Sequence, residues 1–186
     1  MVAAAGLATP GILVLVAIVV SAAAATATAV ALGSRADLAS SRHRVDAAWS
    51  ALRPALDARY RDLGAAAAVA HDRLGADRSV FDDVNRAVAA WPGTAGQATD
   101  RQVAAAAALE GLAGRLAAVV AATPRLRAAG DVGEAMGRLQ QSDSGAGRAA
   151  YNAAVAAYQR ARGGFPRRLV AGALGYDDRR TFETPA

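Results

Sequence analysis

The stretch Gly11–Leu32, GILVLVAIVVSAAAATATAVAL, contains no charged residue, and the first charged side chain of the whole sequence is Arg35. An α-helix rises about 1.5 Å per residue, so about 20 apolar residues cross roughly 30 Å of hydrocarbon. Within the stretch, Ile12–Val20 is the most apolar part, and we expect it to dominate insertion into a membrane. The sequence therefore predicts a transmembrane helix over residues 11–32, preceded by a short extracytoplasmic segment, residues 1–10.

A cleaved signal peptide is the alternative interpretation of this stretch. Ser21–Ala29 offers small residues of the kind found at cleavage sites. A signal peptide, however, opens with a positively charged segment, whereas only the terminal amine precedes the apolar residues in this sequence. The uncleaved anchor is therefore the favoured prediction.

Three arginines follow the predicted span closely, and no Arg or Lys precedes it: Arg35, Arg42 and Arg44. The positive-inside rule places the more basic flank in the cytoplasm, and it counts Arg and Lys rather than net charge. We therefore expect a single-pass protein of the cell membrane whose remaining chain lies in the cytoplasm. The absence of cysteine is compatible with a reducing compartment.

About 150 of the 186 residues follow the predicted span, which is enough for one domain with its own core. Alanine dominates this part and is the best helix former, and no window shows sustained alternation of apolar and polar residues. The sequence predicts an all-α fold: the N-terminal transmembrane helix, then a long antiparallel bundle of about four helices over residues 35–175, then a C-terminal tail, residues 176–186.

The apolar residues after the span recur mostly at steps of three and four, the spacing of a helix or coiled coil that packs against partner helices. The residues of this predicted seam are Leu38, Val45, Trp49, Leu52, Leu56, Tyr60, Leu63, Ala67, Ala70 and Leu74. Pro54 lies inside the segment and should kink the helix, because proline removes one backbone hydrogen bond.

Further helical segments are separated by proline, glycine and polar stretches. A segment from Arg78 to Trp91 has one apolar face, formed by Val80, Val84, Val88 and Trp91. Thr99 and Gln102 fit a capping box that opens the next helix. The predicted buried positions of that helix are Leu109, Leu112, Leu116 and Val119. Pro124 should break or bend it.

Three shorter predictions complete the helical pattern. A segment from Asp131 carries Val132, Met136 and Leu139 on one side. The stretch 141–147 is the weakest helical part, and the last long helix covers Arg148–Arg162 and ends at two glycines. Pro166 suits the first position of a short helix that ends near Gly175.

Blocks of this sequence resemble the LemA family of bacterial membrane proteins. Residues 42–50, RHRVDAAWS, look like that family's R-x-R-V-x-E-A-W-S, and residues 123–128, TPRLRA, are similar to its Y-P-x-L-K-A. Residues 148–158, RAAYNAAVAAY, resemble R-x-x-Y-N-x-x-V-x-x-Y, and the stretch 165–182 follows the family's tail. The resemblance covers the chain from the anchor to about Phe182.

The resemblance implies a single N-terminal span and a domain of long antiparallel helices, but no agreed biochemical activity. Two stretches depart from the family pattern. After Leu63, the sequence GAAAAV stands where the family usually has I-P-N-L-V, and residues 142–147 form a shorter, glycine-containing stretch where the family has a longer helix. If these motifs form a shared surface, that surface is altered in this chain.

We assign no catalytic, cofactor-binding or metal-binding residue from the sequence. His43 and His71 would lie about 42 Å apart on one helix, which is too far for a shared metal ion. The paired Glu-x-x-His pattern of metal-binding bundles, nucleophile elbows and phosphate-binding loops have no counterpart. The adjacent carboxylates Asp82–Asp83 and Asp177–Asp178 do not face each other on a helix and are expected to face solvent.

Large aromatic side chains are expected to fill the core of an alanine-rich bundle; they are Trp49, Trp91, Tyr151, Tyr158, Phe165 and Tyr176. Two hypotheses remain open for Asn152, which lies either in a buried seam that fixes helix register or at a solvated helix rim. Residues 165–175 likewise have two interpretations. Their apolar residues fold back onto the bundle, or they join the neighbouring arginines (Arg160, Arg162, Arg167, Arg168) in contact with anionic lipid.

The favoured function is a membrane-anchored, non-enzymatic interaction or scaffold protein. Its partners would be the lipid bilayer and either an unknown protein or a second copy of the chain. One alternative is a membrane-tethered enzyme or the accessory subunit of one, which would need a deep pocket with convergent polar groups. A second alternative is an arginine-rich module that binds nucleic acid or anionic lipid. Acidic residues interleave with arginine, so we expect no nucleic-acid partner, and no small-molecule substrate is indicated.

Overall fold

A computed structural model describes residues 8–73, 79–165 and 167–183, and these residues contain helices and no strand. The predicted all-α fold class is therefore confirmed. The chain forms two compact units. Unit 1 consists of the chain up to Arg42 and of Tyr158–Asp177, and unit 2 consists of His43–Ala157 and Asp178–Ala186. The helices α1 and α6 each contribute residues to both units.

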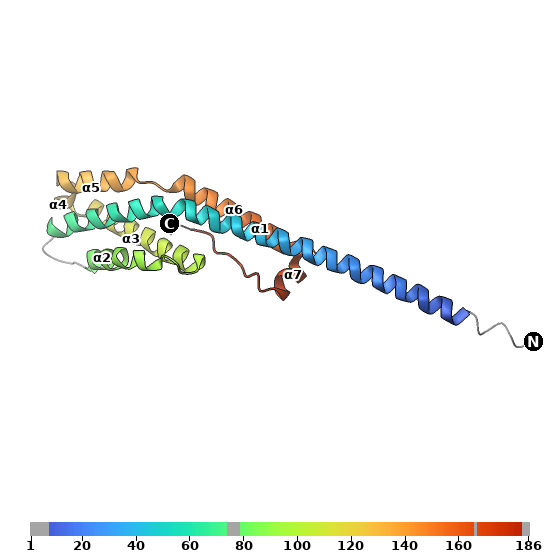
Figure 1. Cartoon of the computed structure of the whole chain (residues 1–186). Helices are drawn as coiled ribbons and strands as arrows, with labels where there is room; N and C mark the ends of the chain where they lie inside the picture. The colour runs from blue at the N-terminus through green and yellow to red at the C-terminus, as the bar shows by residue number, and fades with distance from the viewer. Residues whose placement is uncertain (1–7, 74–78, 166, 184–186) are drawn as a thin grey trace, which may run out of the picture. The chain divides into compact units, whose positions relative to one another are not determined.

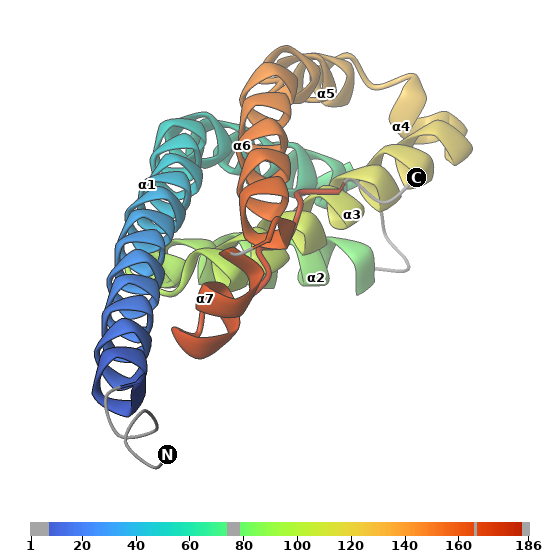
Figure 2. The same cartoon turned by 90° about the vertical axis from the view of Figure 1, so that its right-hand side faces the viewer.

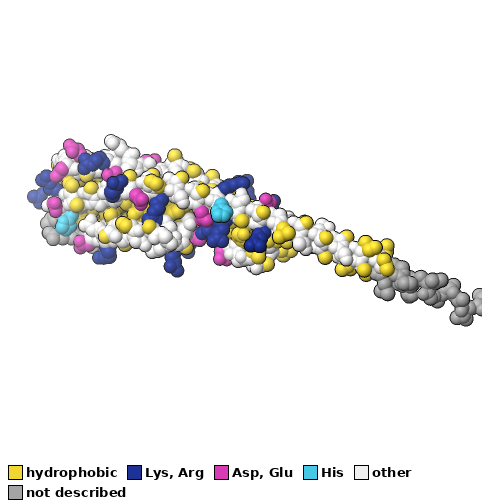
Figure 3. Space-filling view, viewed as in Figure 1, with side chains coloured by type: hydrophobic (Ala, Val, Ile, Leu, Met, Phe, Trp, Pro, Cys, Tyr) yellow, Lys and Arg dark blue, Asp and Glu magenta, His cyan; other side chains and the backbone are white. Residues whose placement is uncertain are grey.

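The first helix, α1, extends over Ala8–Arg73 and contains both the predicted span and the predicted seam (Figure 1). It continues through Pro54 without ending, so a kink at that residue stays a prediction. The first charged residue, Arg35, comes three residues after the apolar stretch, whose described part shows only hydrophobic and uncharged surface in Figure 3. Length and composition make this stretch of α1 a candidate membrane span.

The described side chains of the apolar stretch, residues 14–26 and 28–32, are exposed, as a segment that contacts lipid requires. The large ones are Val14, Leu15, Val16, Ile18, Val19, Val20, Val30 and Leu32. Two hydroxyls interrupt them, and each donates a hydrogen bond within the helix, Thr26 to the Ala22 carbonyl and Thr28 to the Ala24 carbonyl, both at 2.9 Å. A hydroxyl in hydrocarbon needs such an internal acceptor, because no water is present there. The two threonines are thus compatible with a membrane environment.

The seam of α1 is buried as predicted. In unit 2 its buried members are Val45, Trp49, Leu52, Leu56, Tyr60, Leu63, Ala67 and Ala70, and in unit 1 Leu38 is buried. The last predicted member, Leu74, lies outside the described residues. Burial of this stripe follows from the helical period, because positions three and four apart share one face.

The middle of unit 2 is a series of helices that pack on their neighbours in sequence. These are α2 (Ser79–Ala90), the 3-10 helix η1 (Trp91–Thr94), α3 (Thr99–Ala122), α4 (Pro124–Arg127) and α5 (Gly130–Gln141). Figure 2 shows α2 alongside α3. Pro124 separates α3 from α4 as predicted, since α3 ends at Ala122.

Some residues that were predicted to be buried are only half-buried, and in α2 and α5 a neighbouring residue is buried in their place. In α2 the fully buried residues are Phe81 and Val84, whereas Val80 and Val88 are only half-buried. In α3, Leu109, Leu112 and Leu116 are buried, but Val119 is half-buried. In α5, Val132 and Leu139 are buried together with Ala135, and Met136 is half-buried. An alanine at the centre of the face explains this last shift, because small side chains let the helix approach its neighbours closely.

The predicted capping box at the start of α3 was also wrong. Neither side chain caps the helix. Thr99 instead donates its hydroxyl to Asp46 at 3.0 Å, and Gln102 is buried, where its oxygen accepts the Trp49 indole N–H at 2.8 Å. Thr99 and Gln102 have the spacing of a capping box, but they join α3 to α1 instead, because each finds a hydrogen-bond partner on α1.

Helix α6 (Gly145–Gly163) comes very close to α1 at one glycine. A Cβ added to Gly147 would lie 2.7 Å from Leu52 Cδ1, nearer than side-chain carbons approach one another. Gly114, in the middle of α3, has no atom within 4 Å of the same position. A side chain at residue 147 would therefore force the end of Leu52 to move, whereas one at residue 114 would contact nothing.

We expect Gly147→Val to lower the free energy of unfolding by about 1–3 kcal/mol, because the added methyl groups overpack the contact with Leu52. The matched Gly114→Ala variant should raise it by about 0.5–1 kcal/mol, because alanine loses less backbone entropy in a helix. Denaturant unfolding of the two full-length variants in detergent micelles measures both. Equal effects at the two sites would contradict the close approach.

Unit 1 contains the end of α6, the short helix α7 (Arg167–Ala173) and the first part of α1. Three aromatic predictions are decided here. Tyr158 is buried and donates its hydroxyl to the Asp177 carbonyl at 2.9 Å, whereas Tyr176 is half-buried. Phe165 is exposed, so its predicted place in a core was wrong. The predicted first residue of α7, Pro166, lies outside the described residues.

Candidate functional site

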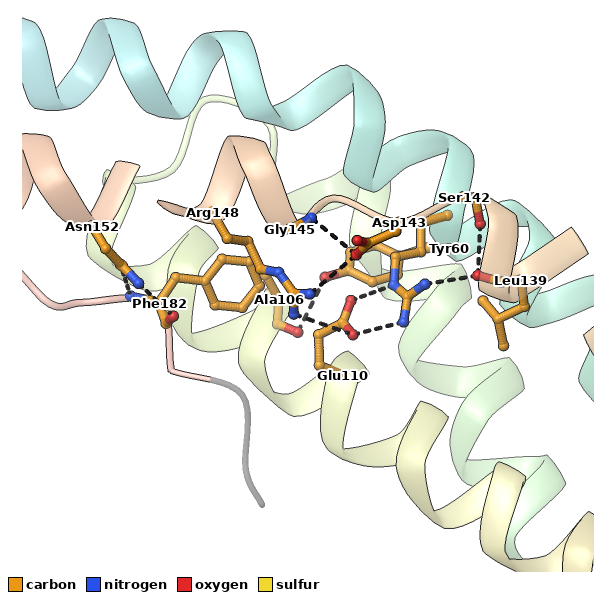
Figure 4. A network of polar contacts seen from close by, with 11 residues as sticks. Tyr60, Ala106, Glu110, Leu139, Ser142, Asp143, Gly145, Arg148, Asn152 and Phe182 are labelled. Carbon is orange, nitrogen blue, oxygen red and sulfur yellow. Dashed lines mark hydrogen bonds and ion pairs between the residues drawn. The ribbon is translucent and has the colours of Figure 1, made fainter. Parts of the chain in front are cut away.

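A buried carboxylate in unit 2 is shared by two arginines that come from different helices. Glu110 lies on α3 and its side chain is only 3% exposed. Arg59 of α1 donates to both of its oxygens, from Nε at 2.8 Å and from an Nη at 3.0 Å. Arg148 of α6 lies 3.8 Å from the same carboxylate. This network (Arg59, Glu110, Arg148) therefore joins three helices at one point (Figure 4).

The remaining polar groups of the two arginines are also bonded. Arg59 donates a further hydrogen bond to the Leu139 carbonyl at 2.8 Å, which brings in the end of α5. Arg148 lies 3.3 Å from Asp143, whose carboxylate also accepts the Gly145 backbone N–H at 2.9 Å at the start of α6. The charges are thus paired and supplemented by hydrogen bonds, the condition under which buried ions are tolerated.

Electrostatic effects in this region follow from the pairing and the burial. The hydrogen bond with Glu110 raises the pKa of Arg59 above its usual value, although burial opposes the shift. Burial, with the nearby Glu110 charge, strongly raises the pKa of the Tyr60 phenol, which donates its O–H to the Ala106 carbonyl at 3.1 Å. Both groups stay in their ordinary protonation states near neutral pH. Arg59 and Tyr60 therefore take part as hydrogen-bond donors between helices.

A second polar cluster in unit 2 holds the C-terminal segment in place. Asn152 of α6 donates to the Phe182 carbonyl at 3.0 Å and accepts the Phe182 backbone N–H at 2.7 Å. The Phe182 ring is buried and meets the edge of Trp49 at a centroid distance of 6.2 Å. Neither hypothesis for Asn152, a buried helix seam or a solvated helix rim, describes this role. Its side-chain amide instead makes two hydrogen bonds to the backbone of Phe182.

Charged side chains also hold the C-terminal segment to α1 and α3. Arg179 lies 3.2 Å from Asp100 and 3.4 Å from Asp46, and its side chain is 9% exposed. Tyr151 donates its hydroxyl to the Arg180 carbonyl at 2.9 Å, and burial raises its pKa to about 12. Residues 179–182, within the predicted C-terminal tail, are therefore a docked part of the domain, which we name the clamped segment.

The blocks that carry the family resemblance meet at the clamped segment. Asp46 and Trp49 come from the front block, Tyr151 and Asn152 from the rear block, and Phe182 from the tail. Trp49 and Tyr151 also make an edge-to-face contact at 5.4 Å. The motifs that carry the resemblance thus build a structural contact between α1, α6 and the clamped segment in unit 2.

The histidines and paired carboxylates of the sequence form no common site. His43 is exposed and His71 is half-buried beside Phe81. Within residues 8–73, 79–165 and 167–183, no group of three His, Cys, Asp or Glu side chains is placed to hold a metal ion. Asp82, Asp177 and Asp178 are exposed, as expected, whereas Asp83 is half-buried and pairs with Arg86 at 3.0 Å.

An open groove lies along the outer side of α3. Small side chains form most of its lining, namely Ala107, Ala108, Gly111, Gly114 and Ala118, with Leu112, Glu110 and Arg115 beside them. All of these residues belong to one helix, so the groove is a shallow strip and not an enclosed cavity. Its chemistry is that of a surface which a second helix can approach closely.

Sequence reasoning missed both the network and the clamped segment. One signal for the network was available, since Glu110 is the single acidic residue of α3 after its first turn. A lone carboxylate in such an apolar helix needs a cation close by. The signal for the clamped segment was Phe182, a large aromatic residue in a stretch that is otherwise polar.

Comparison with known proteins supports the resemblance found in the sequence. The family model described as "LemA family" matches residues 48–186, which is most of the chain and includes the network and the clamped segment. No curated protein and no solved structure matches the chain. Both the motif blocks and this match lead to one conclusion, that the chain belongs to the LemA family.

Proposed function

We propose that this chain is a non-enzymatic interaction module anchored in the cell membrane. In this proposal α1 crosses the membrane once over residues 11–32, and unit 2 lies in the cytoplasm and presents helical surface to a protein partner or to a second copy. The observation that carries the proposal is that one helix, α1, contains both an exposed apolar stretch of membrane-spanning length and the buried seam of unit 2.

Continuity of α1 also favours an anchor over a cleaved leader. The small residues Ser21–Ala29, where cleavage would occur, lie in the middle of the helix. The orientation rests on Arg35, Arg42 and Arg44, which follow the span and mark the cytoplasmic side.

The non-enzymatic part of the proposal is supported by what the buried charges do. Glu110, which is buried in unit 2 at the edge of the α3 groove, is engaged by two guanidinium groups and so serves to pair charges between helices. The α3 groove, in contrast, allows another helix to pack closely against the α3 backbone. Its alanines and glycines are small enough for a distance between the two helix axes of about 8 Å, near the short end of the range for packed helices.

Alkaline extraction of membranes tests the anchor. The full-length chain should stay in the membrane pellet, whereas Val16→Asp/Val19→Asp should be released, because each charge at a span centre costs about 2.5–3.5 kcal/mol of insertion. The matched Val16→Ala/Val19→Ala variant should remain in the pellet. A freely soluble wild-type chain that lacks its first residues would overturn the anchor, and a reporter fused after Ala186 that is active only outside the cell would overturn the orientation.

Photo-crosslinking in membranes tests the interaction surface. A crosslinking residue at Ala107 or Ala118, in the α3 groove, should give a discrete protein adduct, and the same residue at the exposed Gln140 of α5 should not. An adduct of twice the chain's mass would identify self-association, and another mass a different partner. Failure to obtain an adduct at either groove position would contradict the proposed surface.

A further inference from the structure

The short helix α7 is fixed to α1 near the end of the predicted span. Arg167 lies 2.6 Å from Asp37 of α1, and both residues belong to unit 1. Asp37 follows Leu32 by five residues, which corresponds to about 7.5 Å along a helix. The first residue of α7 is therefore held at the depth where lipid headgroups surround a helix that has just left the hydrocarbon.

The conformation of α7 is well defined despite its length. Gly175 has a φ of 67°, and the Tyr176 N–H donates to the Ala171 carbonyl at 3.0 Å, the arrangement of a Schellman cap. The Tyr158 hydroxyl then holds the Asp177 carbonyl. Ala171 is buried, so α7 has an inner face that packs within unit 1 and an outer face that does not.

Three large apolar side chains are exposed at α7, namely Leu169 within the helix, Phe165 just before it and Leu174 just after it. Phe165 is 86% exposed, Leu169 is 66% exposed and Leu174 is 49% exposed. The interpretation that Leu169, Val170 and Leu174 fold back was therefore wrong for Leu169 and Leu174, whereas Val170 is half-buried. Single exposed apolar residues are ordinary, but three around one short helix beside a membrane-spanning segment indicate a partner surface.

The charge of the surrounding sequence indicates which surface this is. From Tyr158 to Tyr176, the stretch of unit 1 that contains α7, the chain has four arginines and no acidic residue, although acidic residues interleave with arginine elsewhere. Arg168 is exposed on α7 itself. Apolar side chains flanked by arginine suit the boundary between acyl chains and anionic headgroups, where interfacial helices bind.

We propose that α7 is a second membrane contact, in which Phe165, Leu169 and Leu174 enter the headgroup–acyl boundary of the leaflet that α1 leaves, and Arg168 binds anionic lipid headgroups. This inference rests on the proposed anchor, because Asp37 sets the depth of α7 only if α1 spans the bilayer. A monotopic contact of this kind would fix the rotation of α1 about its axis, since only one side of the helix carries α7.

Site-directed spin labelling of the full-length chain tests the contact. The chain has no native cysteine, so Leu169→Cys, Val19→Cys and Ala153→Cys each carry one label, at α7, in the span and on the exposed side of α6. The chain is reconstituted in phosphatidylcholine vesicles with and without phosphatidylglycerol. We expect the label at residue 169 to be more accessible to oxygen than to a water-soluble nickel complex, as at residue 19, and the label at residue 153 to show the reverse.

The outcomes separate the two proposals. A label at residue 169 in water while the label at residue 19 is in lipid would overturn the α7 contact and leave the anchor standing. Both labels in water would overturn the anchor itself. Spin–spin broadening at residue 169 without oxygen access would show that a second copy covers this face, which also overturns the lipid contact.

Neutralising one arginine tests the role of charge. In vesicles with phosphatidylglycerol, Arg168→Gln should reduce the ratio of lipid-bound to free label at residue 169 about fivefold, the value for one basic residue near an anionic surface. Without phosphatidylglycerol the same substitution should have little effect. An equal loss in both kinds of vesicle would mean that Arg168 acts through the fold and not through anionic lipid.

Discussion

Replacement of Glu110 by alanine is expected to lower the free energy of unfolding by about 3–5 kcal/mol, one of the largest effects of a single substitution in this chain. The carboxylate is 3% exposed and Arg59 is only 15% exposed, so the Arg59 guanidinium would lose its acidic partner where water has little access, while Arg148 would keep Asp143. The cost is mainly the penalty for a charge left unpaired in the interior, rather than the net value of the pair.

Denaturant unfolding of the full-length chain in detergent micelles measures this effect. Near-ultraviolet circular dichroism is a suitable signal, because both tryptophans, Trp49 and Trp91, are buried in unit 2. The matched control is Asp83→Ala, which removes the more exposed pair with Arg86 within α2. An exposed pair three residues apart contributes only about 0.2–0.5 kcal/mol.

A combined variant separates charge pairing from packing. Glu110→Leu with Arg59→Met replaces one ion pair by apolar groups of similar size, and such replacements in other proteins are often neutral or stabilising. We expect the combined variant to recover a substantial part of the stability that Glu110→Ala loses, with Arg148 still paired to Asp143. A loss below about 1 kcal/mol for Glu110→Ala would show that the network contributes no more than a surface pair does.

The parts of the fold that were predictable are those set by local pattern. The seam of α1 follows from the period of its apolar residues, and the break between α3 and α4 follows from Pro124. Both depend on neighbours within one turn of helix. For the same reason the apolar stretch could be found without any knowledge of the rest of the chain.

The network and the clamped segment could not be predicted in this way, because their partners are far apart in the sequence. Arg59 and Glu110 are 51 residues apart, and Asn152 and Phe182 are 30 residues apart. The capping box failed for the same reason, since Thr99 and Gln102 satisfied a local rule but found acceptors and donors on α1. When a polar residue has both a local and a distant possible hydrogen-bond partner, the tertiary fold determines which partner it binds.

The second large effect is expected from Phe182→Ala, which should release the clamped segment and lower the free energy of unfolding by about 3 kcal/mol, near the low end for a buried phenylalanine. The low end is appropriate because the segment can detach instead of leaving a cavity beside Trp49. Detachment also exposes Arg179, whose side chain is 9% exposed while it is paired with Asp46 and Asp100.

Limited trypsin digestion distinguishes detachment from general destabilisation. In the wild-type chain we expect slow cleavage after Arg179, because the backbone just after it is held: Arg180 by Tyr151 and Asp100, and Phe182 by Asn152. Phe182→Ala should accelerate that cleavage while sites in unit 2 that precede α6 stay protected. Asn152→Leu should do the same, since it removes two hydrogen bonds to the Phe182 backbone, whereas Thr181→Ala, at an exposed side chain, should leave the rate unchanged. If cleavage after Arg179 were equally fast in the wild type and in Phe182→Ala, the segment would not be clamped, and the family motifs that converge on it would need a different explanation.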